Sequence, residues 1–194
     1  MRRIAAIGLL LVVAGASAWA QDAPRPQASE QQVNELIAQY TLLVQANQVS
    51  KAITMAERAL AAAEAAYGLD HQQVAQVLND LGYMRQRQSG FAQAEQLHRR
   101  ALAIRERAFP PNDAAVVQSL NNVGKAYAAQ NRFAEAAAVY QRSLALTERH
   151  VAPNAPHVLT VLEPYEHVLR RQGMTEAADA MAKRIKEIRA ATPP

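Results

Sequence analysis

Cysteine is absent from this sequence of 194 residues, and its absence removes several kinds of chemistry at once. Without cysteine the chain has no disulfide, no thiolate nucleophile and no cysteine-ligated metal site. The sequence also contains no glycine-rich phosphate loop, no G-x-S-x-G motif and no H-E-x-x-H motif. These absences predict a protein that is not an enzyme and that holds neither a cofactor nor a metal.

Charged residues are scattered along the chain rather than clustered. The formal net charge is +4, but lysine and arginine form no dense run of the kind that indicates nucleic-acid binding. Half of the residues are hydrophobic and only 5% are aromatic. Runs of β-branched residues are missing after the first twenty positions, whereas Ala, Leu, Gln, Glu and Arg, which favour helix, are common. The composition predicts an all-α protein without a nucleic-acid partner.

The first twenty residues have the features of an export signal. Arg2 and Arg3 precede a short apolar run, and the sequence Ala-Trp-Ala at 18–20 matches a small-x-small cleavage site. We expect cleavage after Ala20, a periplasmic or secreted mature protein of bacterial type, and no stable membrane insertion after cleavage. The alternative is a retained membrane anchor, although the apolar run is short for a bilayer. A polar, proline-containing linker is expected at 21–32.

A pattern of small and large residues recurs every 42 residues. Around Gly124 and Ala136 these residues follow helical spacing on both sides of a break at Asn131. A fixed step of this size is typical of stacked helical hairpins. We expect four hairpins, at about 33–68, 70–109, 112–151 and 154–191, before a tail at 192–194. The columns predicted to fill the core are Leu36, Leu78, Leu120 and Leu162; Ala52, Ala94, Ala136 and Ala178; and Leu60, Leu102 and Leu144.

Polar residues recur at the expected helix ends. Asp70, Asn112 and Asn154 precede the first helix of the last three hairpins and are predicted N-caps. Gln73 gives the first of these the pattern of a capping box. The breaks inside the hairpins are predicted to adopt the left-handed conformation that ends a helix. These break residues are Asn47, Ser89, Asn131 and Gly173, and a further column, Glu64, Glu106 and Glu148, is predicted to be solvated.

These columns resemble the tetratricopeptide repeat (TPR). The 42-residue step and the Leu-Asn-Asn/Asp-Leu/Val-Gly motif are similar to the longer repeats of the kinesin light chain type. The resemblance covers about 33–191 and implies an all-α right-handed superhelix of about four helical hairpins. In such a solenoid the first helix of each hairpin, helix A, lines a concave groove. The terminal repeats depart from the pattern at Gln39, Tyr40, Pro164, Glu166 and Lys186, as expected where one side of a repeat faces water.

The resemblance implies a protein or peptide partner, bound as an extended segment in the concave groove of a non-catalytic scaffold. Asparagine and glutamine offer donors and acceptors to a peptide backbone, and family members use asparagines in the columns of Asn79 and Asn121. Lys125 and Arg170 would favour an acidic segment or a carboxylate, although the paired Lys/Asn clamp of some members is incomplete here. The other reading is that these polar residues are only solvated. The candidate groove residues are Gln76, Asn79, Tyr83, Gln86, Gln118, Asn121, Asn122, Lys125, His167 and Arg170.

Two other functions remain open from the sequence. A self-assembling structural protein would stack through its end repeats, with Met174, Met181 and Ile185 as the apolar patch of a homo-oligomer. A cell-envelope hydrolase or metal-dependent enzyme would use Glu163 and His167, which lie four residues apart on one helix face. A surface ion pair is the commoner reason for that spacing.

Single residues also depart from the repeat pattern. Pro164 falls inside a predicted helix and is expected to bend it. The bend is either tolerated at the end of the stack or turns His167, Arg170 and Arg171 toward a ligand. His98 stands where the next repeat has Tyr140, so His98 is predicted to pack between hairpins and Tyr140 to lie in the core.

Overall fold

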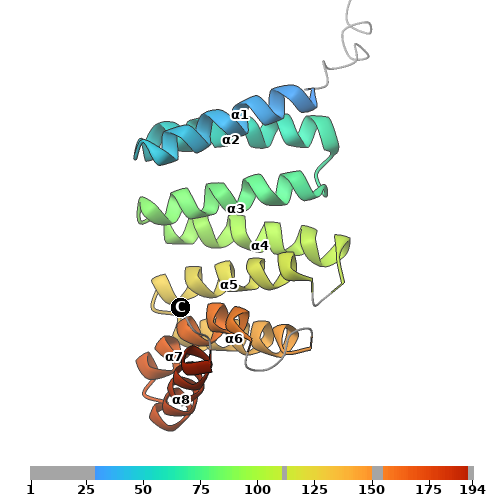
Figure 1. Cartoon of the computed structure of the whole chain (residues 1–194). Helices are drawn as coiled ribbons and strands as arrows, with labels where there is room; N and C mark the ends of the chain where they lie inside the picture. Colours follow the sequence, from blue (N-terminus) through green and yellow to red (C-terminus); the bar gives the residue numbers. More distant parts are fainter. Residues whose placement is uncertain (1–28, 111–112, 150–154, 192–194) are drawn as a thin grey trace, which may run out of the picture.

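The computed structural model describes residues 29–110, 113–149 and 155–191, and within these ranges the chain is helical without strands (Figure 1). The predicted signal at 1–20 lies outside them. Four antiparallel hairpins follow one another, as the repeat pattern predicts. They are formed by α1 (Glu30–Gln45) and α2 (Val49–Tyr67); α3 (Gln72–Arg87) and α4 (Phe91–Ala108); α5 (Ala114–Ala129) and α6 (Phe133–Thr147); and, after the 3₁₀ turn η1 (Pro156–Val158), α7 (Leu159–Arg171) and α8 (Thr175–Ala191).

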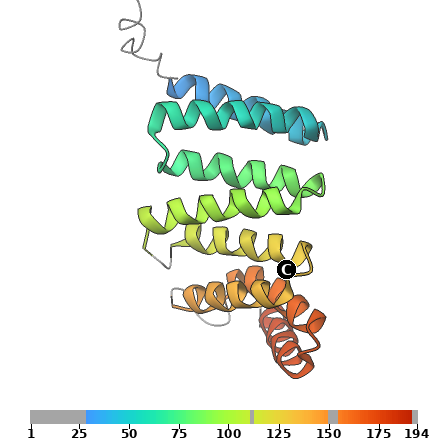
Figure 2. The same cartoon turned by 180° about the vertical axis from the view of Figure 1, so that it is seen from behind.

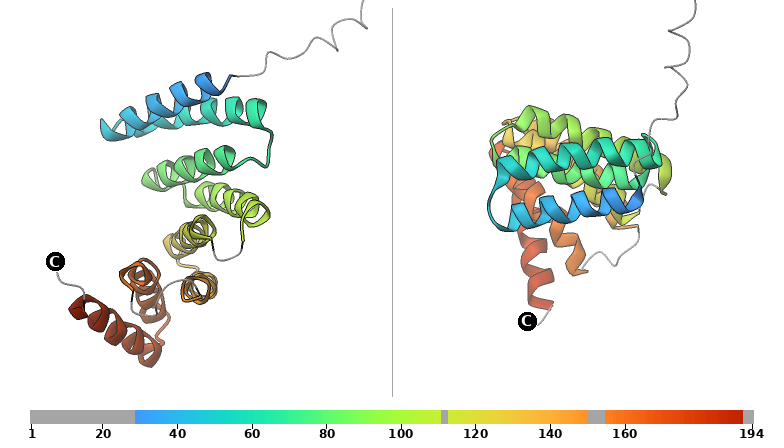
Figure 3. Two further views of the ribbon diagram at one scale, coloured as in Figure 1. Left: turned by 45° about the vertical axis from the view of Figure 1, so that its right-hand side comes forward. Right: turned by 90° about the horizontal axis from the view of Figure 1, so that it is seen from above.

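The hairpins stack in chain order into a curved solenoid. Each hairpin packs mainly on its neighbours, and the same order is visible from both sides (Figures 1 and 2). The stack also twists, so that α7 and α8 run across the direction of the first hairpins (Figure 3). No helix in the described part of the chain is both long enough and apolar enough to cross a bilayer.

All four turns inside the hairpins have the predicted left-handed residue. The φ angles are 57° at Asn47, 61° at Ser89, 59° at Asn131 and 75° at Gly173. The amide after each of these residues donates to a carbonyl five positions earlier, as when Arg132 N binds Tyr127 O at 3.0 Å. This is the Schellman arrangement, which satisfies the free carbonyls at the end of a helix and reverses the chain.

Where the structure describes them, the N-caps lie one residue after the predicted positions. The side chain of His71, not Asp70, accepts the amide of Gln73 at 3.2 Å at the start of α3. The Asp70 carboxylate instead binds Arg107. Asp113 caps α5 by accepting the amide of Ala115 at 2.8 Å. Asn112 and Asn154 lie outside the described residues. The three α1 residues before the expected repeat start at 33 are already helical, because Ser29 caps that helix.

The two helices of each hairpin approach closely through complementary side-chain volumes. The predicted alanine column is fully buried at Ala52, Ala94, Ala136 and Ala178, and the Leu36 column is buried too. In the second and third hairpins a glycine of helix A lies under a ring of helix B, at Gly82–His98 and Gly124–Tyr140. His98 therefore packs on the first helix of its own hairpin. In the first hairpin the volumes are exchanged, with buried Tyr40 in the glycine column and buried Ala56 in the ring column; Leu60 and Leu102 are only half-buried.

The glutamates predicted to be solvated are in fact paired. Each carboxylate binds an arginine that lies 36 residues later, on the second helix of the next hairpin. These ion pairs join α2 to α4, α4 to α6 and α6 to α8, so they follow one side of the solenoid. The pairs are Glu64–Arg100 at 2.6 Å, Glu106–Arg142 at 2.7 Å, and Glu148–Arg184.

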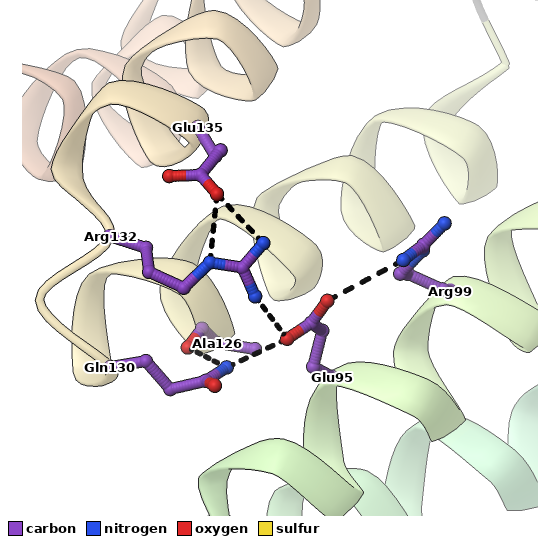
Figure 4. Close-up of polar contacts among 6 residues, drawn as sticks. All are labelled: Glu95, Arg99, Ala126, Gln130, Arg132 and Glu135. Atoms are coloured by element: carbon purple, nitrogen blue, oxygen red, sulfur yellow. Dashed lines mark hydrogen bonds and ion pairs between the residues drawn. The ribbon is translucent and has the colours of Figure 1, made fainter.

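Glu95 of α4 is the centre of a charged cluster where the second hairpin meets the third (Figure 4). Its carboxylate accepts from Arg132 at 2.7 Å and from Gln130 at 2.9 Å, and it lies 3.5 Å from Arg99. Arg132 also binds Glu135 at 2.7 Å. Because Glu95 is nearly buried, these donors are needed to offset the loss of hydration of its charge.

The two ends of the stack differ from its middle. In α3 the side that meets the preceding hairpin is fully apolar, at Val74, Val77, Leu81 and Met84. The matching positions of α1 are all exposed and mostly polar: Gln32, Glu35, Gln39 and Leu42. A polar outer face is expected for a terminal repeat.

The C-terminal patch proposed for self-assembly is smaller than predicted. Ile185 is buried in the core of the last hairpin with Leu162, so it is not available to a partner. Met181 is half-buried, and Met174 is exposed. Pro164 lies inside α7, which continues as one α-helix from Leu159 to Arg171.

Candidate functional site

A groove of about 1150 Å³ follows the first helices of the last three hairpins. Its walls come from α3, α5 and the start of α7, and the C-terminal end of α4 contributes to its floor. It is lined by Gln76, Arg105, Pro110, Asp113, Ala114, Ala115, Val117, Gln118, Asn121, Asn122, Lys125, Thr147, His157 and Thr160.

Half of the predicted groove residues lie along this groove, namely Gln76, Gln118, Asn121, Asn122 and Lys125. The other half do not line it. Asn79 is buried, and Tyr83 and Gln86 lie further along α3, with Tyr83 exposed. His167 and Arg170 are exposed on α7 outside the groove, and Arg170 already binds Glu166 and Asp179.

The two asparagines singled out from the family pattern hold the fold together. Asn79 Nδ2 donates to Ser119 Oγ at 3.4 Å, and its Oδ1 lies 3.1 Å from His98 Nδ1 and accepts from Asn122 at 3.4 Å. Asn121 Oδ1 accepts from Ser143 at 2.7 Å. The two residues are only 5% and 7% exposed, respectively; the next hairpin covers Asn79, and Asn121 is bound by Ser143 of its own hairpin. Neither Oδ1 is therefore free for a partner.

Arg105 is one of the groove residues that the sequence did not indicate. It comes from the last turns of α4, a second helix, and is 5% exposed. Its Nη1 donates to the Ala115 carbonyl, to Gln118 Oε1 and to Ser119 Oγ, each at 3.0 Å, and its Nη2 donates to Gln76 Oε1 at 3.0 Å. The residues at the same position of the neighbouring repeats, Ala63 and Thr147, are both buried. This column could have indicated that Arg105 is buried as well.

A hydrogen-bonded chain extends from Arg105 to the first hairpin. Gln76 Nε2 donates to Asp80 Oδ1 at 3.0 Å, and the Tyr40 hydroxyl donates to Asp80 Oδ2 at 2.6 Å. Burial raises the pKa of Asp80, although both hydrogen bonds and the charge of Arg105 oppose the rise. Burial also lowers the pKa of Arg105, against the opposing charges of Asp80 and Asp113. The groove floor is thus a polar network that spans three hairpins.

His98 lies just behind the groove and is 1% exposed. An amide oxygen can only accept hydrogen bonds, so Asn79 Oδ1 accepts from His98 Nδ1 as well as from Asn122. The neutral imidazole therefore carries its proton on Nδ1. Within the described residues Nε2 has no hydrogen-bond partner. Burial, and secondarily the charge of Lys125, lower the pKa of His98 to about 4.

Of the pair of residues considered for enzymatic chemistry, Glu163 already has a partner. Glu163 accepts from Arg189 at 2.9 Å, and His167 is exposed. In the described part of the chain no three histidine or acidic side chains come together as a metal site.

The sequence profile of the tetratricopeptide repeat matches residues 41–107 and 76–149, which together make up more than half of the chain. The chain belongs to the tetratricopeptide repeat family. Proteins of this family and fold are generally non-enzymatic scaffolds that bind other proteins. No curated protein matches the chain.

Solved structures of other TPR proteins have the same fold. BtubC (BKLC) from P. vanneervenii is 22% identical, with a TM-score of 0.77 over 84% of this chain and 66% of BtubC. A putative kinesin light chain from Podosopora anserina with nearly identical TPR-like repeats is 16% identical, with a TM-score of 0.76 over 86% of this chain and 79% of that one. MamA MSR-1 is 20% identical, with a TM-score of 0.61 over 83% and 79%.

Proposed function

We propose that this TPR protein is a non-catalytic adaptor of the bacterial cell envelope that binds an extended polypeptide segment in the groove along α3, α5 and α7. The observation that carries the proposal is the polar lining of this groove. Between hairpins, polar side chains such as Gln130 and Arg142 are used in contacts within the stack. In the groove, Gln118 and Lys125 are exposed and keep donors free on the side of the solvent.

The size and position of the groove agree with this function. A volume of about 1150 Å³ exceeds what a small metabolite needs. Its lining comes from three successive hairpins, and each repeat is held by its neighbours, so the groove is presented without a separate folding step. Backbone carbonyls and amides of an extended segment would pair with the exposed amide of Gln118, the half-buried amide of Asn122 and the hydroxyl of Thr160.

Photo-crosslinking and affinity capture from envelope extract test the proposal. The groove variant is Lys125→Glu, and the matched control is Lys51→Glu, at an exposed position of α2 outside the groove. We expect wild type and the Lys51 variant to capture the same polypeptides and the Lys125 variant to lose them. Equal capture by all three proteins would exclude the groove. Asn79 and Asn121 are unsuitable for this experiment, because both are buried.

The envelope location rests on the expected signal at 1–20 and is tested separately. Trp19 is the only tryptophan, so a chain cut after Ala20 has no tryptophan fluorescence and begins at Gln21. Intact-mass measurement of exported protein should give this start. An Ala18→Leu, Ala20→Leu variant should remain uncut, and a tryptophan signal in exported wild type would contradict the cleavage.

Self-assembly is less well supported as a second function. The outer face of α1 is mostly polar and Ile185 is buried, which leaves Met174 as the exposed part of the predicted patch. Light scattering distinguishes the two functions. We expect the mass of one chain for wild type and for Met174→Ser, whereas a larger mass that falls in the variant would favour assembly.

A further inference from the structure

Arg105 is a buried cation that meets no carboxylate among the described residues. Other arginines between hairpins, such as Arg100, Arg132 and Arg142, each meet a carboxylate at 2.6–2.7 Å. The contacts of Arg105 within the described residues are four neutral oxygens at 3.0 Å. Neutral acceptors hold a guanidinium in place but do not neutralise its charge. Burying an unpaired charge lowers the stability of the fold. The groove floor therefore carries a positive charge that the fold does not neutralise by contact.

The groove is also biased toward hydrogen-bond donors. Arg105 engages the Oε1 atoms of Gln76 and Gln118 from both sides, so the exposed end of Gln118 is its donor amide. Lys125, two helical turns further along α5, adds an exposed ammonium without a partner in the described structure. Asp113 is the acidic residue of the lining, and its Oδ1 caps α5. Acceptors, and anionic acceptors above all, complement such a surface.

We propose that the groove selects an acidic segment of its partner, with one side-chain carboxylate beside Gln118 paired to Arg105 and a second acidic side chain at Lys125. The proposal rests on the proposed function and specifies its ligand. Seven residues of helix separate Gln118 from Lys125, or about 10 Å. An extended segment in the polyproline II conformation advances about 3.1 Å per residue with three residues per turn, so two acidic residues three positions apart lie on one side of it, about 9 Å apart.

The probe is an end-blocked peptide, Gly-Ser-Glu-Ser-Gly-Glu-Ser-Gly, compared by calorimetry with the same peptide carrying Gln in place of both Glu residues. A third peptide has the Gln sequence and a free C-terminal carboxylate. We expect the Glu peptide to bind at least tenfold more tightly than the blocked Gln peptide. Equal binding of these two would overturn the proposal. Binding of the third peptide alone would also overturn it, because the occupant would then be a chain end.

Protein variants test the two cationic positions. Arg105→Met is expected to weaken binding of the Glu peptide at least tenfold, and Lys125→Gln about threefold. Because Arg105 also supports the fold, Gln118→Glu is the sharper variant: it supplies the missing carboxylate from the chain itself. It should abolish preference for the Glu peptide and raise the melting temperature. Gln141→Glu, the same charge change on the exposed side of α6, should leave binding unchanged.

The outcomes separate this proposal from the proposed function. If Gln118→Glu binds the Glu peptide as wild type does, the carboxylate site at Arg105 is wrong, while envelope capture that depends on Lys125 would still support a peptide groove. If capture is indifferent to Lys125→Glu, and neither blocked peptide binds, the groove function itself fails, and the acidic preference fails with it.

Discussion

A Cβ atom at position 82 would lie 2.6 Å from Cε1 of His98, closer than any normal contact. The imidazole has no room to retreat, because it is buried and bound to Asn79 at 3.1 Å. Gly82 is thus required by the ring above it rather than by its backbone angles. The same relation recurs one repeat later between Gly124 and Tyr140, where the distance would be 2.7 Å.

Gly82→Ala is predicted to destabilise the protein by about 2 kcal/mol. Overpacking a core costs roughly 1–3 kcal/mol and outweighs the gain of about 1 kcal/mol when alanine replaces glycine in a helix. Urea denaturation measures the change. In a His98→Ala background the ring is gone, so the added methyl should become neutral or stabilising. An equal loss in both backgrounds would show that the ring is not the cause.

Protonation of His98 gives a second prediction. Its pKa is about 4 in the fold and about 6.5 when unfolded. The unfolded chain therefore binds more protons between these values, and stability falls as the pH drops through this window. From pH 7.5 to 4.5 the contribution of His98 is a loss of about 2 to 3 kcal/mol.

Asp80 titrates in the opposite sense at the acidic end, because its raised pKa favours the folded state there. The free energy of unfolding is therefore compared between wild type and His98→Tyr. Tyrosine is chosen because Tyr140 packs over Gly124 at the equivalent position of the next repeat. Urea denaturation at pH 4.5 and 7.5 should show a steeper acid loss for wild type. Parallel pH profiles of the two proteins would contradict the prediction.

The fold could be predicted because equal positions of the repeats obey equal constraints. Ala94 and Ala136 fill the same gap, and Ser89 and Asn131 make the same turn, so columns 42 residues apart reveal both. Contacts between unlike columns are invisible to such a comparison. The pairing of Glu106 with Arg142 crosses columns, and this is why the glutamate was predicted to be solvated.

The groove was predictable in outline but not at its floor. Gln118 and Lys125 follow from the exposed face of a helix A. Asn79 lies on the same face of its helix, but the following hairpin covers it. The local sequence pattern does not indicate which residues of that face the next hairpin will bury. Arg105 was missed because helix B was expected to face away from the groove. The Arg105 side chain, however, contacts both α3 and α5.

The ion pairs between second helices are predicted to be individually weak. Glu106 and Arg142 are at least one-third exposed, and exposed pairs contribute about 0.2–1 kcal/mol. A double-mutant cycle with Glu106→Gln and Arg142→Gln should give a coupling energy in this range at low salt. The coupling should shrink in 1 M NaCl, where screening acts within a few ångströms. A coupling above 2 kcal/mol that ignores salt would contradict this account.

Ser89 is the position at which the turn chemistry can be improved. Its φ of 61° lies in the left-handed region, which costs a non-glycine residue about 1–2 kcal/mol. Asn47 and Asn131 tolerate that region better, and Gly173 occupies it freely. Ser89→Gly should therefore stabilise the protein by about 1 kcal/mol, less the extra entropy that glycine gives the unfolded chain.

The matched control for this change is Gly173→Ala at the equivalent turn of the last hairpin. A Cβ there would meet no atom within 4 Å, so any effect comes from the backbone angle of 75° alone. We expect Gly173→Ala to destabilise by about 1 kcal/mol. Thermal denaturation of both variants measures the two effects, which should have opposite signs. If Ser89→Gly also destabilises, the serine contributes an interaction at the turn that outweighs its backbone strain.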